Sequence, residues 1–302
     1  MLTIYQRSVA YRKTRQVPEF QKSAWIHLEK PTEDELKTAS ETLKVELGHL
    51  KDALDPYEAP RLEMEKEGVY TFVRYPHNES TRPLLIVVAK EGVLTISQEP
   101  NPIIDRFLSG DVDFYTTQKA RFVLLILSEI NKGYTGAMAT IRKEINRSKT
   151  SPDKMTSKDI VKLVSYESTV GSYVDALIPQ QAVLNKILLG KTFNVPDEDE
   201  DLAEDLVLST NQLIDAGRAA LRTMVNIRSA YTAISTERLN IIIRRLTALT
   251  VLLTVPTVIT SFYGMNVMLP AQDTPLAPYA IFALIIAIVG VLLYALSRNK
   301  WL

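Results

Sequence analysis

Two long stretches without a charged residue lie near the C-terminal end of the sequence, and they constrain the fold more than any other feature. The first extends from Leu246 to Tyr263 and the second from Tyr279 to Ser297. Each has roughly the 20 apolar residues that a helix needs to cross the hydrocarbon layer of a membrane. No earlier stretch is comparable. The sequence therefore predicts a large soluble part followed by a two-helix transmembrane hairpin.

The charges that flank these stretches predict the orientation of the hairpin. Arg244 and Arg245 precede the first stretch, Arg298 and Lys300 follow the second, and residues 264–278 between them contain no basic residue. Basic residues favour the cytoplasmic side of a membrane. We therefore expect a multi-pass protein of the inner or plasma membrane, with both termini in the cytoplasm and the loop outside. A buried hairpin in a soluble protein is the alternative, and two charge-free stretches with matching basic flanks argue against it.

A stripe of mainly polar residues marks one side of the first stretch and of the helix that precedes it. Its members recur at alternating steps of three and four, which places them on one face of an α-helix: Asn240, Ile243, Thr247, Thr250, Thr254, Thr257 and Ser261. In hydrocarbon, hydroxyl groups must face other helices or water. Two interpretations stay open. The stripe is either a helix–helix contact, with hydroxyls bonded to carbonyls one turn earlier, or the wall of a polar pore.

Composition argues against several other functions. The 302 residues carry no net charge, which gives no reason to expect a nucleic-acid partner. Without cysteine there are no thiolate metal sites, and His27, His49 and His77 show no metal-ligand spacing. The sequence also lacks a nucleophile elbow, a P-loop and a glycine-rich dinucleotide motif. We therefore do not expect an enzyme.

The N-terminal part, residues 1–110, alternates short strands and helices and is predicted to form an α/β domain. Thr32 and Glu35 have the spacing of a capping box, so a helix is expected to begin there and to continue to about Leu47. Branched residues bounded by glycine or proline predict strands, which we place at residues 2–6, 24–28, 69–74, 84–89 and 93–97. Residues 90–92 are expected to form the hairpin turn between the last two.

The remainder of the soluble part is predicted to be helical. Helices are expected over residues 114–149, 157–176 and 178–189, with Pro179 separating the last two. From Asp201 the helical pattern continues without a break to Tyr263. One helix cannot enclose a pore, so a conducting function would require a ring of identical chains. The predicted parts are a helical region 111–196, a stalk 197–245, a first membrane helix 246–263, an external loop 264–278, a second membrane helix 279–297 and a basic tail 298–302.

An acidic run at residues 197–205 opens the stalk helix. Carboxylates are favoured at a helix N-terminus, so capping and solvation are one explanation. Low-affinity binding of a divalent cation between subunits is the other, since Mg²⁺ accepts oxygen ligands, often through its own waters. Asp52, at a predicted helix end in the N-terminal domain, is by itself a solvated turn residue.

The motif Tyr263-Gly264-Met265-Asn266, placed between two terminal membrane helices behind a long soluble region, resembles the CorA family of magnesium channels. The Gly-Met-Asn signature of that family is intact. The resemblance extends over essentially the whole chain. It implies an α+β membrane protein with a cytoplasmic α/β domain, a long helical stalk, a transmembrane hairpin and a cyclic, pentameric assembly.

The resemblance also implies roles for individual residues. The family places its entrance filter at Gly264, Met265 and Asn266, with Gly264 allowing a tight turn. Ile243 and Leu246 fall where the family has an apolar constriction, whereas Thr254 stands where many relatives have a bulky apolar residue. Regulatory Mg²⁺ would bind between subunits at Asp52 and Asp205. The implied pore lining is Asn240, Ile243, Leu246, Thr247, Thr250, Thr254, Thr257 and Ser261.

The function implied by the family is transport of hydrated Mg²⁺, together with Co²⁺ or Ni²⁺, into the cytoplasm down the membrane potential. Mg²⁺ would be both the transported ion and the regulatory ligand, and the partners would be copies of this chain and membrane lipid. Two alternatives remain. A Zn²⁺ transporter of the same superfamily has the same architecture and is distinguished by a flux assay. A membrane-anchored sensor or scaffold predicts no flux and tolerance of Asn266→Ala.

Overall fold

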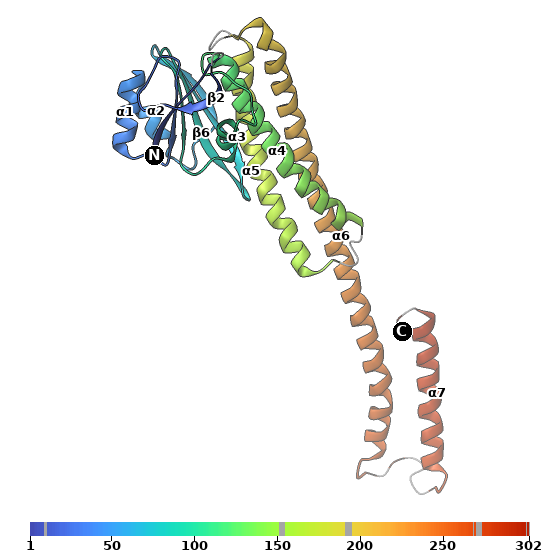
Figure 1. The fold of residues 1–302 in the computed structure, drawn as a ribbon. Helices are drawn as coiled ribbons and strands as arrows, with labels where there is room; N and C mark the ends of the chain where they lie inside the picture. Colours follow the sequence, from blue (N-terminus) through green and yellow to red (C-terminus); the bar gives the residue numbers. More distant parts are fainter. Residues whose placement is uncertain are drawn as a thin grey trace. The chain divides into compact units, whose positions relative to one another are not determined.

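The computed structural model describes residues 1–8, 11–150, 155–190, 195–267, 269, 274–299 and 301. The chain divides into two units, Met1–Ile227 and Arg228–Leu302. Figure 1 shows the strands and the covering helices of the first unit. The helix α6 (Asp197–Tyr263) contributes to both units. Because the units are separate bodies, each is considered by itself.

The first unit is built on one seven-stranded sheet. Its strands lie in the order β2-β1-β3-β7-β6-β5-β4. Only the pair β3 and β7 is parallel, and every other neighbouring pair is antiparallel. The strands are β1 (Leu2–Ser8), β2 (Tyr11–Gln16), β3 (Trp25–Glu29), β4 (Arg61–Met64), β5 (Gly68–His77), β6 (Ser80–Ala89) and β7 (Val93–Ser97). The predicted turn between β6 and β7 is confirmed, since Ala89 N–H donates to the Gly92 carbonyl at 3.0 Å.

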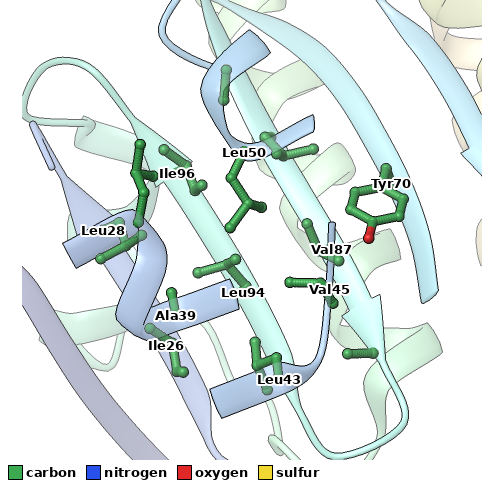
Figure 2. Packing of buried hydrophobic residues seen from close by; sticks show 14 of the residues in the cluster. Ile26, Leu28, Ala39, Leu43, Val45, Leu50, Tyr70, Val87, Leu94 and Ile96 are labelled. Atoms are coloured by element: carbon green, nitrogen blue, oxygen red, sulfur yellow. The ribbon is translucent and has the colours of Figure 1, made fainter. Parts of the chain in front are cut away.

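Two short helices cover one face of the sheet. They are α1 (Glu33–Leu43) and α2 (Leu47–Asp52). Their buried side chains, among them Ala39 and Leu50, pack against Ile26, Leu94 and Val87 of the central strands (Figure 2). Alternate residues of a strand point to opposite faces. This core therefore uses only every second residue of β3 and β7.

The opposite face of the sheet is covered by three further helices, α3 (Pro102–Ser109), α4 (Lys119–Thr150) and α5 (Ser157–Leu188). Trp25 points to this side, and its ring centre lies 5.8 Å from that of Phe114 and 5.1 Å from that of Phe122. Both α4 and α5 pack against β5. With helices on both faces, the central strands β3 and β7 are buried at every residue except Glu29.

Three of the helix boundaries differ from the prediction. The helix expected from residue 114 begins only at Lys119, because Thr116 and Thr117 form a turn before it. The capping box of Thr32 and Glu35 is present, but α1 ends at Leu43 rather than at about Leu47. Lys44 adopts a left-handed conformation (φ 55°), which ends α1 and turns the chain so that Val45 is buried. A separate helix, α2, follows. The sequence does not predict this helix end, because the left-handed residue that ends a helix is usually glycine or asparagine rather than lysine.

Pro179 does not divide the helical region as predicted. The helix α5 continues through it from Ser157 to Leu188. A proline removes one main-chain hydrogen bond from a helix interior. The loss is offset by packing on both sides of the proline, since Leu177 and Val183 are both buried. Tertiary contacts therefore override the local signal here.

The second unit contains the C-terminal part of α6 and the helix α7 (Ala277–Arg298). Each of the two helices includes a stretch that is long and apolar enough to cross a membrane. Only 6% of the residues in that stretch of α6 are buried, and none in α7. A core helix of a soluble protein would be mostly buried. The alternative of a buried soluble hairpin is therefore wrong for the described residues.

Candidate ion pathway and regulatory carboxylates

The polar stripe of α6 lies on the surface of the single chain. The neighbouring Leu246 is exposed, and so are all residues of the stripe: Asn240, Ile243, Thr247, Thr250, Thr254, Thr257 and Ser261. The C-terminal part of the stripe, from Thr250 onwards, forms an open groove of about 600 Å³. The groove is lined by Thr250, Leu253, Thr254, Thr257, Val258, Ser261, Phe262 and Met265. The groove therefore joins the hydroxyl groups to the residues that follow the helix.

Three threonines of the stripe share one hydrogen-bonding arrangement. The hydroxyls of Thr250, Thr254 and Thr257 each donate to the main-chain carbonyl one turn earlier, at 2.9, 2.7 and 2.8 Å. A hydroxyl has one donor and two acceptor lone pairs. With the donor used by the backbone, each oxygen presents only its lone pairs to the groove. The stripe is thus a row of hydrogen-bond acceptors on an otherwise apolar helix.

The Gly-Met-Asn segment begins where α6 ends. Gly264 N–H donates to the carbonyls of Thr260 and Ser261, at 3.0 and 3.2 Å, and Met265 N–H donates to the Phe262 carbonyl at 3.3 Å. These bonds close a final tight turn after Tyr263. Met265 and Asn266 are both exposed.

Gly264 stands in a tight turn, as predicted, and the structure shows why a glycine suits it. Its φ is not positive, so a left-handed turn does not require it. Instead, a Cβ atom built at this position would lie 3.3 Å from the Thr260 carbonyl oxygen. That separation is tight for a side-chain carbon. Gly264 therefore lets the last turn of α6 close against its own backbone. Met268, Pro270 and Asp273 of the loop lie outside the described residues.

The predicted apolar constriction is a pair of exposed aliphatic side chains in the single chain. Ile243 is 51% exposed and Leu246 is 61% exposed. Asn240 lies about one turn before Ile243 on α6. Exposed isoleucine and leucine beside a polar stripe are unfavourable in water, and copies of the same helix would cover them.

Asp52 is the last residue of α2 and is already paired. Its carboxylate accepts a 2.8 Å hydrogen bond from Arg61 Nη2, and its side chain is 46% exposed. Arg61 also forms ion pairs with Glu58 and Glu63. Burial lowers the pKa of Arg61, but its hydrogen bond to Glu63 and the charges of Glu58 and Asp52 outweigh that effect and raise the pKa. Asp52 therefore belongs to a charge network in which Arg61 forms ion pairs with three carboxylates.

Asp205 lies in a different environment. It is exposed on α6 and forms no ion pair with any residue that the structure describes. One member of the acidic run does have a structural role. Asp199 is buried and forms an ion pair with Arg121 of α4. The run is therefore not uniformly solvated, and Asp199 anchors the start of α6 to the α/β unit.

Comparison with known proteins identifies the family. The chain matches the family model described as CorA-like Mg²⁺ transporter protein over residues 20–298. The protein belongs to this CorA-like family. The family consists of transporters rather than enzymes, and its fold explains the α/β domain, the long helix and the C-terminal apolar helices as parts of a membrane protein.

Individual relatives agree with this assignment. The chain is 26% identical over 297 residues to the cobalt/magnesium transport protein CorA of Methanocaldococcus jannaschii, and the match covers 92% of this chain and 91% of the relative. The complete structure of the CorA magnesium transporter from the same organism superposes with a TM-score of 0.85 at 23% identity, covering 100% of this chain and 99% of that one. The cytoplasmic domain of ZntB from Vibrio parahaemolyticus superposes with a TM-score of 0.65 at 12% identity, covering 78% and 98%.

Proposed function

We propose that copies of this CorA-family chain form a ring that conducts hydrated Mg²⁺, together with Co²⁺ or Ni²⁺, into the cytoplasm. In this proposal the polar stripe of α6 faces the axis of a homo-oligomer, which the resemblance suggests is a pentamer. The hydroxyl groups of the stripe support it, because hydroxyl groups in a membrane need water or other helices. The name of the M. jannaschii relative, a cobalt/magnesium transport protein, supports the choice of Mg²⁺ and Co²⁺.

The observation that carries the proposal is the row of threonine acceptors in a groove that ends at Met265 of the Gly-Met-Asn segment, in a chain of the CorA-like family. Mg²⁺ gives up its water reluctantly. The water molecules bound to a cation turn their hydrogens outward, so a wall that recognises the hydrated ion must accept hydrogen bonds. Thr250, Thr254 and Thr257 present only acceptors because their protons are donated to the backbone. Neutral oxygens bind the water shell without trapping the ion. Asn266 would act in the same way at the outer mouth.

Passage into the cytoplasm needs a driving force and a barrier. Two positive charges gain about 4.6 kcal/mol per 100 mV of membrane potential, which is sufficient to drive uptake. Rings of Ile243 and Leu246, covered by neighbouring copies, would form an apolar constriction that closes by dewetting. Cytosolic Mg²⁺ held between Asp52 of one subunit and Asp205 of the next would hold the ring shut. The free exposure of Asp205 and the partial exposure of Asp52 leave both carboxylates accessible to such an ion.

Ion uptake into proteoliposomes tests the proposal. The purified full-length chain should take up Mg²⁺ under an inside-negative potential, and Asn266→Ala should abolish uptake. Asn299→Ala, which changes an exposed asparagine after α7, is the matched control and should retain uptake. Uptake of Zn²⁺ alone, driven by a proton gradient, would contradict the magnesium proposal. Normal oligomer assembly without any flux, or unchanged flux in Asn266→Ala, would support a sensor or scaffold instead.

A further inference from the structure

A second group of metal-ligating side chains lies in the α/β unit, apart from the stripe of α6. Glu46, His49 and Glu65 each bring one ligand atom to a common point, where these atoms all lie within 4.8 Å of one another. Glu46 is the N-cap residue of α2, and His49 follows three positions later, so both point from one side of that helix. Glu65 follows β4 at the start of the turn that leads into β5. The cluster therefore joins two segments that are distant in sequence.

The two nitrogens of His49 have different surroundings. Nδ1 lies 3.1 Å from a carboxylate oxygen of Glu63, and the other carboxylate oxygen of Glu63 accepts a hydrogen bond from Arg61 Nε. Nε2 lies on the side of Glu46, 3.6 Å from its carboxylate. A carboxylate at Nδ1 favours the tautomer in which Nδ1 carries the proton and Nε2 keeps its lone pair. Metal-binding histidines almost always have such a carboxylate or carbonyl partner on the second nitrogen.

The imidazole ring is also fixed in orientation. The side chain of His49 is only 16% exposed. Its ring centre lies 4.5 Å from that of Tyr70, which is fully buried, and the Tyr70 hydroxyl accepts a 2.7 Å hydrogen bond from the Glu46 main chain. One buried tyrosine thus positions both the histidine ring and the start of α2. For His49, the loss of side-chain freedom that usually opposes metal binding has already occurred on folding.

We infer that Nε2 of His49, together with the carboxylates of Glu46 and Glu65, binds a borderline divalent cation of the Zn²⁺, Co²⁺ or Ni²⁺ class. Water completes the coordination. Imidazole nitrogen is a good ligand for these ions, whereas Mg²⁺ prefers oxygen ligands only. The site is distinct from the ion pathway and from Asp205, but it adjoins Asp52, whose carboxylate lies 3.9 Å from His49 Nδ1. Glu63 is a positioning residue, because it holds Nδ1 rather than the metal.

A titration with Zn²⁺ distinguishes a metal site from an imidazolium ion paired with the same carboxylates. We would titrate the purified full-length protein, in detergent and in an excess of Mg²⁺, with Zn²⁺ and follow the heat of binding. The excess of Mg²⁺ occupies sites built from oxygen alone. The wild-type chain is expected to bind one Zn²⁺ per subunit with an affinity that Mg²⁺ does not abolish.

Three variants and one control make the titration decisive. His49→Gln and Glu65→Gln should each weaken Zn²⁺ binding at least roughly tenfold, and Glu63→Gln should weaken it within about 10- to 100-fold as a positioning partner. Glu65 is exposed in a turn, so its variant is expected to fold normally. His77→Gln is the matched control, because His77 Nε2 lies 3.2 Å from the single carboxylate of Glu99 and has no second ligand nearby among the described residues.

The Zn²⁺ titration measures binding without flux. Its result is therefore independent of the result of the transport experiment. Anomalous scattering at the zinc edge from crystals grown with Zn²⁺ should show a peak beside His49 Nε2. Zn²⁺ binding that is unchanged in both His49→Gln and Glu65→Gln would overturn the inference. So would a wild-type chain that shows no Zn²⁺ binding in excess Mg²⁺.

Discussion

The hydroxyl of Thr254 donates a 2.7 Å hydrogen bond to the main-chain carbonyl of Thr250, one turn earlier on α6. A helix–helix contact and a pore wall would both contain this bond, so it does not by itself choose between them. Its consequence is chemical. The Thr254 oxygen keeps only acceptor lone pairs for whatever lies in front of it, and a hydrated cation offers the matching donors.

Thr254→Val tests this consequence. Valine has nearly the shape of threonine but offers no acceptor. We expect Mg²⁺ flux to fall at least roughly tenfold, because every subunit of the ring loses one hydrogen bond of about 1 kcal/mol to the hydrated ion. Thr260→Val is the matched control, since Thr260 makes the same kind of backbone bond from outside the stripe. Equal effects of the two substitutions on uptake into proteoliposomes would argue against a pore wall at Thr254.

Asp205→Ala tests the proposed regulation. Removal of the carboxylate should weaken inhibition of flux by Mg²⁺ on the cytoplasmic side by roughly tenfold or more in concentration, because an oxygen ligand of the regulatory ion is lost. Asp215→Ala changes another exposed acid of α6 (its side chain is 81% exposed) and serves as the control. Inhibition that is identical in wild type and Asp205→Ala would remove Asp205 from the mechanism.

Gly217 of α6 is predicted to be essential for packing in the α/β unit. A Cβ atom at this position would lie 2.5 Å from Val174 Cγ2 and 3.1 Å from Met138 Cε. We therefore expect Gly217→Ala to reduce stability by about 1–3 kcal/mol through overpacking. Gly136→Ala adds a Cβ in open space within α4 and should be neutral or slightly stabilising. The midpoints of thermal unfolding of the two variants test this prediction. We expect a lower midpoint than in the wild type for Gly217→Ala only.

His27 predicts a pH dependence of stability. Burial lowers the pKa of His27 to about 4, and a hydrogen bond that the imidazole donates to Thr95 opposes this shift only in part. Between about pH 6.5 and pH 4 the unfolded chain therefore binds a proton that the folded chain does not. Stability should decrease as the pH falls through this range, by up to about 3 kcal/mol. In His27→Gln this part of the pH dependence should disappear. An unchanged slope in the variant would show that other groups cause it.

Much of the fold could be predicted because its signals are local. The capping box at Thr32 and the charge-free stretches each depend on residues that are neighbours in sequence. The strands β2 and β4 were missed. They are edge strands, and the sequence of β2, Tyr-Arg-Lys-Thr-Arg-Gln, lacks the apolar alternation that reveals a half-buried strand.

The site was predictable only in part, for a related reason. The spacing of the threonines on α6 is a local pattern, so the stripe could be recognised from the sequence. The cluster around His49 was missed, because Glu63 and Glu65 reach it only when the hairpin of β4 and β5 lies beside α2. The spacing of Glu46 and His49 was the only signal available in the sequence. Gly264 shows the same limit, since its close approach to Thr260 depends on the closed last turn of α6.

The central claim is that the threonine stripe faces a water-filled path between copies of α6. The chain contains no cysteine, so single cysteines report on accessibility without background. We would introduce Thr254→Cys on the stripe and Ile259→Cys on the opposite side of α6, and treat each with a charged, membrane-impermeant thiol reagent during Mg²⁺ uptake. We expect the reagent to modify Thr254→Cys and to block its flux, whereas Ile259→Cys should stay unmodified and active. Modification of Ile259→Cys with Thr254→Cys protected would contradict it.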